Sequence, residues 1–265
     1  MAEPALIHTK FEAQALRRPS ALAISSSDGT LSYAELEQLS RHLAALIDQA
    51  RLGRRDVVAI LADRGAQVVV AALACARAGR PFVVLDLAYP AQRLAALIEI
   101  CQPQLLLLAG KTTGALSRDL PSIRVDLDPS NASTAALPQD ISPDDAAYLL
   151  FTSGSTGTPK CVACSHRPLV NFVGWQARTF DLGEDDRFTL LSGLSHDPIL
   201  RDIFTPLSLG GSIHIPSQAA ITAPGELFDW FARTRPTAAH MTPPLGHLLT
   251  EIGRASCRER VFGYV

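Results

Sequence analysis

The chain has 265 residues, of which 47% are hydrophobic, and its formal net charge at pH 7 is −2. A chain of this size can bury a substantial core, while its near neutrality provides no electrostatic attraction for nucleic acid or for an anionic membrane surface. No signal-like apolar core and no run of ~18 apolar residues occurs. We therefore expect a cytoplasmic protein that neither crosses a membrane nor binds nucleic acid.

The first predicted helix follows Ser32. Ser32 and Glu35 have the spacing of a capping box, in which each residue bonds to the backbone of the other. Apolar residues then recur at helical spacing, at Leu36, Leu39, Leu43 and Leu46. The pattern predicts an amphipathic helix with one face toward the core.

Short apolar runs alternate with alanine- and leucine-rich segments along the chain. The runs that predict strands are Val57–Leu61, Pro81–Leu85, Leu105–Leu108, Ala146–Phe151, Thr189–Leu191 and Ser212–Ile215. Two of the segments between them, Gln67–Arg77 and Arg93–Ile100, predict helices. This order is typical of a layered α/β fold with largely parallel sheets and flanking helices.

The organisation of the chain into parts follows from its composition. Asp126–Asp145 is rich in Pro, Ser, Asn and Asp, which predicts a surface linker between two subdomains, at about 1–125 and 146–250. Glu251–Val261, reading EIGRASCRERV, has no apolar periodicity and resembles the translation of a sequencing adapter. We expect native sequence up to residue 250 and a non-native tail at 252–265.

The segment Tyr148–Lys160, reading YLLFTSGSTGTPK, changes abruptly from an apolar run to a loop of hydroxyls and glycines. Glycines allow close ligand approach, hydroxyls donate hydrogen bonds, and a lysine supplies a mobile positive charge suited to phosphate. The residues we expect to bind phosphate are Thr152, Ser153, Gly154, Ser155, Thr156, Gly157, Thr158 and Lys160. The spacing differs from the Walker motif, and no helix-forming run follows directly. From the residues alone, a phosphate-binding loop and a Gly/Ser/Thr-rich hairpin turn both remain open.

A second group of candidate residues lies in the segment 194–204, reading LSHDPILRDIF. Asp197 followed by Pro198 is a good helix start, in which the carboxylate caps free amides. Arg201 lies one helical turn further on, so it either pairs with Asp197 or faces the same pocket. His240 precedes a Thr-Pro-Pro turn, and from the sequence it is either structural or a pocket contact.

Five cysteines in a chain of this length do not indicate a disulfide framework. Cys161, Cys164 and nearby His166 form the one cluster with metal-like spacing, but a second ligand pair is missing. If the segment is a strand, the two cysteine side chains face opposite ways. We expect ordinary reduced thiols and assign no metal ligand.

These motifs carry a family resemblance. The loop YLLFTSGSTGTPK resembles the signature loop of adenylate-forming enzymes, specifically the adenylation domains of nonribosomal peptide synthetases. Leu31–Leu36 resembles the first motif of that family, and Ala76–Asp86 resembles the second. The pattern HDPxxRDxFTPL is similar to α-aminoadipate reductase-type adenylation domains. The chain departs from the family at Cys161, where glycine is usual, and at His196, where phenylalanine is more common.

The resemblance implies a partial AMP-binding domain that uses ATP and Mg²⁺ to activate an amino-acid carboxylate as an aminoacyl-adenylate. The product would pass to the phosphopantetheine thiol of a carrier protein, expected in the same parent polypeptide. The loop would hold the β- and γ-phosphates, Asp197 the α-ammonium group, and Pro198 and Arg201 would line the substrate pocket. A guanidinium there suits a second carboxylate, so α-aminoadipate is the expected substrate. His240 falls near another pocket-lining region.

The family's adenine-stacking residues, ribose-binding aspartate and adenylation lysine have no counterpart before residue 250. We therefore assign no catalytic residue and expect the fragment to be inactive alone. Two alternatives remain: a coenzyme A ligase of the same superfamily, which needs no ammonium anchor, and a non-catalytic nucleotide-binding remnant.

Overall fold

The computed structural model describes residues 6–111, 120–132, 140–152, 159–252 and 260–263. The strands of one sheet are ordered β6 (Ser122–Arg124), β5 (Leu105–Ala109), β3 (Val58–Ala62), β4 (Phe82–Asp86), β7 (Ala146–Thr152) and β8 (Lys160–Ser165). The other sheet is ordered β12 (Arg260–Gly263), β11 (Ala238–Met241), β9 (Arg187–Thr189), β10 (Ser212–His214), β1 (Leu22–Ser26) and β2 (Gly29–Ser32). All pairs are parallel except β7 with β8 and β1 with β2. The expected α/β architecture with largely parallel sheets is confirmed.

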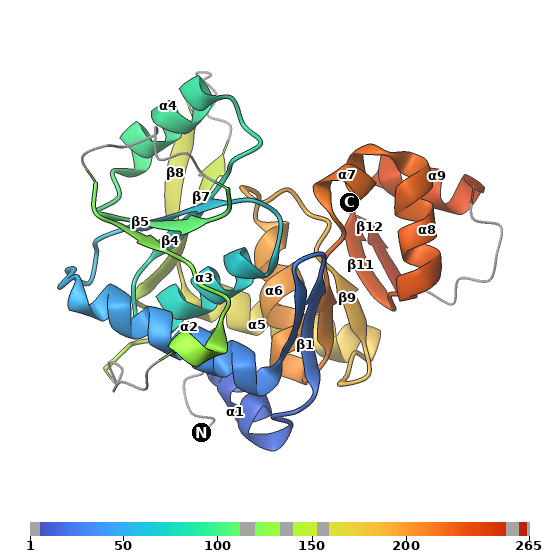
Figure 1. Ribbon diagram of the computed structural model, residues 1–265, viewed down its shortest axis with the longest axis horizontal. Helices are drawn as coiled ribbons and strands as arrows, with labels where there is room; N and C mark the ends of the chain where they lie inside the picture. Colours follow the sequence, from blue (N-terminus) through green and yellow to red (C-terminus); the bar gives the residue numbers. More distant parts are fainter. Residues whose placement is uncertain (1–5, 112–119, 133–139, 153–158, 253–259, 264–265) are drawn as a thin grey trace.

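Helices lie between the two sheets and also on the outer faces of the sheets (Figure 1). The helices of the described chain are α1 (Thr9–Arg17), α2 (Tyr33–Gln49), α3 (Ala66–Arg77), α4 (Ala91–Cys101), the short 3₁₀ turn η1 (Pro129–Asn131), α5 (His166–Phe180), α6 (Pro198–Leu209), α7 (Gln218–Thr222), α8 (Pro224–Thr234) and α9 (Pro243–Ile252). Side chains of α1, α2, α3, α5 and α6 share one hydrophobic core with both sheets. This core fixes the two sheets relative to each other.

Strand β3 shows how the pleat divides its residues between two cores. Val58 and Ile60 belong to the central core, whereas Ala59 and Leu61 belong to a second core under α4. Successive strand side chains point to opposite faces, so a strand buried on both sides reads as a continuous apolar run. The apolar run at Val57–Leu61 therefore predicted the strand but contained no signal for which core each residue joins.

The expected elements match the structure closely at the helix after Ser32. The Ser32 hydroxyl accepts from the Glu35 amide at 3.2 Å, and the Glu35 carboxylate accepts from the Ser32 amide at 2.7 Å. The strand expected at Thr189–Leu191 is wrong by two residues, because the ladder with β10 ends at Thr189. Leu190 and Leu191 stay buried but begin the following loop.

The expected linker, Asp126–Asp145, lies between β6 and β7 of the same sheet, and the division into two subdomains stays a prediction. Strands β1 and β2 join the sheet of β9–β12, whereas β7 and β8 join the sheet of β3–β6. The linker residue Ile141 packs on Gly79, which follows α3 with a φ of +63°. A Cβ on Gly79 would lie 2.9 Å from the Ile141 side chain, so both the conformation and the contact require glycine.

The expected non-native tail falls partly on β12. This strand pairs in parallel with β11 at the edge of its sheet, while 253–259 and 264–265 lie outside the described residues. Edge pairing uses main-chain groups, which any sequence can supply. The non-native origin of 252–265 therefore stays a prediction.

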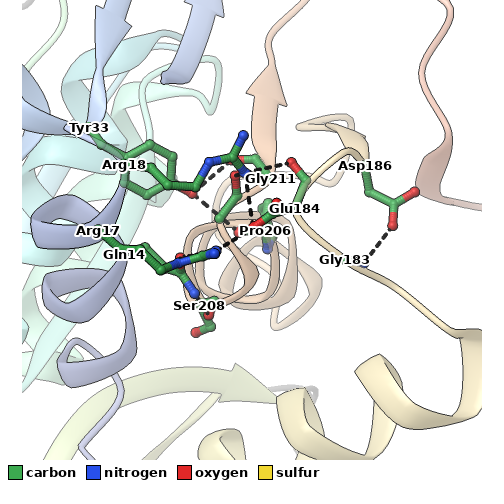
Figure 2. Close-up of polar contacts among 11 residues, drawn as sticks. Gln14, Arg17, Arg18, Tyr33, Gly183, Glu184, Asp186, Pro206, Ser208 and Gly211 are labelled. Carbon is green, nitrogen blue, oxygen red and sulfur yellow. Dashed lines mark hydrogen bonds and ion pairs between the residues drawn. The ribbon is translucent and has the colours of Figure 1, made fainter. Parts of the chain in front are cut away.

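The C-terminal end of α6 is attached to the N-terminal helices by polar contacts (Figure 2). Tyr33 donates to the Gly211 carbonyl at 2.7 Å, and Arg18 donates to the Gly210 carbonyl at 3.0 Å. Gln14 donates to the Ser208 carbonyl at 3.3 Å. These bonds satisfy carbonyls at and just beyond the end of α6, where the helix itself supplies no donors. They fix the axis of the helix that begins beside Asp197.

Three buried histidines make folding stability depend on pH. Burial lowers the pKa of His8 to about 3 and the pKa values of His166 and His214 to about 4. The unfolded chain binds protons nearer pH 6.5, so stability is expected to fall as pH drops from 7 to 5, by roughly 1–2 kcal/mol per histidine. Urea denaturation at both pH values measures this. A His8→Asn variant should show a smaller loss than the parent, and an equal loss in both would contradict the assignment.

Among the residues described, no helix is both long and apolar enough to cross a lipid bilayer.

Candidate functional site

The expected phosphate loop connects the two strands of an antiparallel hairpin. Thr152 ends β7 and Lys160 begins β8, and the two residues lie directly opposite each other in the ladder. The side chains of both are exposed. The remaining loop candidates, Ser153, Gly154, Ser155, Thr156, Gly157 and Thr158, lie outside the described residues. The hairpin geometry is compatible with both readings of the loop, and phosphate binding stays a prediction.

Asp197 lies at the start of α6 but does not cap it. Its backbone is helical and its side chain makes no capping hydrogen bond, so the capping interpretation is wrong. The carboxylate instead accepts from the Arg201 guanidinium at 2.7 Å. Pro198 is buried at the first helical position, where a missing N–H costs nothing. The Asp197 carboxylate therefore binds the Arg201 guanidinium, one helical turn away, and not the free backbone amides at the start of α6.

Arg201 is held from a second side by α5. Its guanidinium carbon lies 4.9 Å from the centre of the Phe172 ring, a distance typical of a cation–π contact. The Arg201 side chain is 18% exposed, whereas that of Asp197 is 58% exposed. The pair thus presents a carboxylate to the open side and an oriented guanidinium behind it.

The two groups of candidate residues meet at strand β7. Tyr148 and Leu150 of β7 line a small cavity together with Leu194 and Ile199 from the segment that carries Asp197. Burial raises the pKa of Tyr148 to about 12, and the nearby charge of Asp197 contributes to this shift. The strand that leads into the phosphate loop therefore packs against the segment of the expected ammonium anchor.

Other contacts hold the same segment against β4. Ser195 accepts from the Asp86 amide at 2.9 Å, and the His196 ring nitrogen lies 3.4 Å from the Tyr89 hydroxyl. The His196 ring also covers Gly193, where a Cβ would lie 2.6 Å from the ring. The His196 ring takes its place only because residue 193 has no side chain.

His240 lies inside a buried polar network rather than on an open pocket wall. Its Nδ1 is 2.6 Å from an Asp202 carboxylate oxygen, and its Nε2 is 2.6 Å from the Gln176 amide nitrogen. The His240 side chain is 4% exposed, and that of Asp202 is fully buried. The structural reading fits this geometry, because substrate contact would require the network to open. A direct role of His240 in substrate binding stays a prediction.

The sequence analysis missed several residues that organise this region, namely Arg64, Gln176, Asp202 and Thr205. Each is polar and lies within or next to a buried apolar stretch. A polar residue in an apolar stretch could have indicated a buried hydrogen-bonding site, because a buried polar side chain almost always has a partner. The partners themselves come from other elements and could not be read from the sequence.

In the part of the chain that the structure describes, the cysteines are free thiols, at Cys75, Cys101, Cys161 and Cys164. Cys161 packs toward the core under α4, and Cys164 packs toward the central core, so the expected opposite orientation on β8 is confirmed. Burial raises the pKa values of both thiols. Within the described ranges, no three His, Cys, Asp or Glu side chains gather closely enough to hold a metal ion.

Comparison with known proteins assigns this architecture. The profile of the AMP-binding enzyme family matches residues 11–261. The chain belongs to the AMP-binding enzyme family. L-2-aminoadipate reductase from Schizosaccharomyces pombe is 35% identical over 82% of this chain and 18% of its own length. The large subunit of L-2-aminoadipate reductase from Candida glabrata is 32% identical over 92% of this chain and 20% of its own length.

Solved structures of a nonribosomal peptide synthetase share the fold of this AMP-binding chain. The nonribosomal peptide synthetase FmoA3, bound to α-methyl-L-serine-AMP, superposes with a TM-score of 0.87 and 28% identity over 97% of this chain and 29% of that one. Its AMPPNP-bound form gives a TM-score of 0.84. The chain is thus of the nonribosomal peptide synthetase and aminoadipate reductase type, and it spans about a fifth of the length of the two reductases.

Proposed function

We propose that this chain forms part of an enzyme that activates an amino acid as an aminoacyl-adenylate, using ATP and Mg²⁺. The adenylate would then react with the phosphopantetheine thiol of a carrier protein. The observation that carries this proposal is the Asp197–Arg201 pair, which lies next to the strand leading into the Gly/Ser/Thr loop. That arrangement supports an amino-acid site next to a phosphate site.

The chemistry requires positioning and charge neutralisation rather than a protein nucleophile. An oxygen of the substrate carboxylate attacks the α-phosphorus of ATP, and the bond to the β-phosphate breaks to release pyrophosphate. Lys160 and the loop hydroxyls hold the departing phosphates, and Asp197 holds the α-ammonium group. Bound Mg²⁺ would supply positive charge that offsets the charge of the ATP phosphates.

The substrate that best fits Asp197 and Arg201 carries both an ammonium group and a second carboxylate. Such a substrate exchanges the internal ion pair for two new ones, ammonium with Asp197 and carboxylate with Arg201. A neutral amino acid would separate the pair without compensating the guanidinium. We therefore propose an acidic amino acid of the α-aminoadipate class.

The test is amino-acid-dependent exchange of pyrophosphate into ATP by the complete polypeptide that contains this chain. α-Aminoadipate is expected to support exchange better than glutamate or neutral amino acids. Exchange that depends on fatty acids instead would favour a coenzyme A ligase. If titration calorimetry detected ATP binding but no acid supported exchange, the chain would be a nucleotide-binding remnant.

Substitution of Arg201 by glutamine is expected to lower kcat/KM for acidic amino acids at least tenfold while sparing neutral ones. A charge-assisted hydrogen bond is worth about 1.5–3 kcal/mol, and its loss affects only substrates that make it. Exchange measured over a panel of amino acids checks this. Arg178→Gln, which changes an exposed arginine of α5, is the matched control. A proportional loss for every substrate would make Arg201 a structural partner of Asp197 only.

Substitution of Lys160 by alanine is expected to raise the KM for ATP and pyrophosphate roughly tenfold and to change amino-acid binding much less. The lysine charge serves the phosphate end of the site, where a charge-assisted bond has this magnitude. Steady-state exchange with each substrate varied in turn measures the difference. Lys160→Arg keeps the charge and should retain most activity. Parallel loss of all substrates with unfolding would remove the assigned role.

A further inference from the structure

The loop from β9 to α6, residues 190–197, ends at Asp197, and we call it the anchor loop. Arg64, which follows the C-terminal end of β3, donates to the Leu190 carbonyl at 2.7 Å and to the Ser192 carbonyl at 2.9 Å. A planar guanidinium that bonds two carbonyls fixes both their separation and their orientation. Arg64 therefore holds the start of the anchor loop from the other sheet.

Asp202 holds the same segment from the side of α6. One carboxylate oxygen accepts from the Ser192 amide at 3.2 Å, and the other is bonded to His240 Nδ1 at 2.6 Å. The chain of bonds continues from His240 to Gln176 at 2.6 Å, and Thr205 donates to Gln176 at 2.9 Å. All four side chains are nearly or fully buried. Asp202 cannot shift without breaking its bonds to Ser192 and to His240 of β11, and His240 is in turn bonded to Gln176 of α5.

The bonds of this network run in one direction. The Thr205 hydroxyl donates to the Gln176 oxygen, and the Gln176 amide donates to His240 Nε2. His240 therefore carries its proton on Nδ1 and donates it to Asp202. Each donor meets an acceptor, as a buried network requires to be stable. The Asp202 carboxylate accepts a hydrogen bond from the Ser192 amide. A substitution that puts an N–H group in place of that oxygen would set two donors against each other and break the bond.

We propose that Arg64 and Asp202 are positioning residues that together set the backbone of the anchor loop and so fix Asp197 and Arg201 in the substrate site. This inference rests on the function proposed above for Asp197. Arg64 follows β3, a strand of the sheet that contains the β7–β8 hairpin, whereas the anchor loop leaves β9 of the other sheet. Arg64 thereby sets the distance between the amino-acid end and the phosphate end of the site. Adenylation depends on that distance because the carboxylate must lie in line with the α-phosphate.

Three substitutions test the proposal. Arg64→Lys keeps the positive charge but cannot bond both carbonyls. Asp202→Asn keeps the size and can still accept from His240, but it directs an amide donor at the Ser192 amide. Arg77→Lys is the matched control, because Arg77 is also buried and donates to a carbonyl, that of Glu37. Its hydrogen bonds and ion pairs in the described structure are with residues of α1 and α2, not with the anchor loop.

Hydrogen exchange of the present chain gives the first measurement. The protection factor of the Ser192 amide is expected to fall roughly tenfold in both Arg64→Lys and Asp202→Asn. Strands β3 to β5 should keep their protection, and Arg77→Lys should leave Ser192 unchanged. Equal protection of Ser192 in all variants, or equal loss in Arg77→Lys, would overturn the proposal.

Pyrophosphate exchange by the complete polypeptide gives the second measurement. Both variants are expected to raise the amino-acid KM by about tenfold while the ATP KM changes less than about twofold. Parallel increases in both KM values would mean that Arg64 and Asp202 only stabilise the fold. If the parent enzyme supports no exchange with any amino acid, the proposed function fails, and hydrogen exchange alone still decides whether these residues hold the loop.

Discussion

Replacement of Asp197 by asparagine is expected to lower amino-acid-dependent pyrophosphate exchange roughly 10- to 150-fold for every amino acid tested. The substrate ammonium then loses a charge-assisted partner worth about 1.5–3 kcal/mol in a site that excludes water once the substrate binds. The fold should be unaffected, because the Asp197 side chain is 58% exposed. Ion pairs with an exposed partner contribute little to the free energy of unfolding. Exchange kinetics and thermal melting of the same preparation measure both effects.

The matched control for Asp197 is Asp185→Asn, which removes an exposed carboxylate from the loop between α5 and β9, at the other end of β9. It should leave exchange and melting temperature unchanged. An Asp197→Asn enzyme with normal KM and kcat for amino acids would contradict the ammonium-anchor assignment. A loss of activity that accompanied a large fall in melting temperature would instead indicate a structural role.

Replacement of Arg77 by methionine is expected to lower the free energy of unfolding by about 3 kcal/mol, the low end of the range for breaking a buried ion pair. The Arg77 side chain is fully buried between α1, α2 and α3, and it contacts Glu37 at 2.9 Å and Glu12 at 3.2 Å. Burial favours a higher pKa for Glu37, but hydrogen bonds from Arg77 and Arg41 outweigh it and leave that pKa below its ordinary value. Removing Arg77 leaves two half-buried carboxylates close together without their shared cation.

Urea denaturation of the chain measures this loss. The matched control is Arg41→Met, because Arg41 binds the same Glu37 carboxylate oxygen at 2.6 Å but is 37% exposed. Its loss is expected to be below about 1 kcal/mol, since water can replace an exposed pair. If the two arginine variants lost the same stability, burial would not be the reason for the contribution of Arg77.

Much of the local structure could be predicted from the sequence, because it depends on neighbouring residues. The capping box of Ser32 and Glu35 is formed by residues three positions apart, and the structure contains it as predicted. Strands β3, β4, β5 and β7 follow from continuous apolar runs such as Val57–Leu61, whereas β6 and β8 of the same sheet contain no such run and were not predicted. The abrupt change from apolar residues to hydroxyls after Phe151 likewise predicted a loop at the end of a strand. These features require only short-range bonds and a repeat of two or 3.6 residues.

The candidate site was predicted in composition but not in arrangement. Asp197 and Arg201 were recognised as candidates, yet their spacing allowed a helix cap, an ion pair or a shared pocket, and only the folded chain contains the bond between them. Asp202 and His240 are 38 residues apart in the chain, and Arg64 lies 126 residues from Leu190. No local pattern relates such residues. They meet because parallel strands require long crossovers and because buried polar groups must find partners wherever the packing places them.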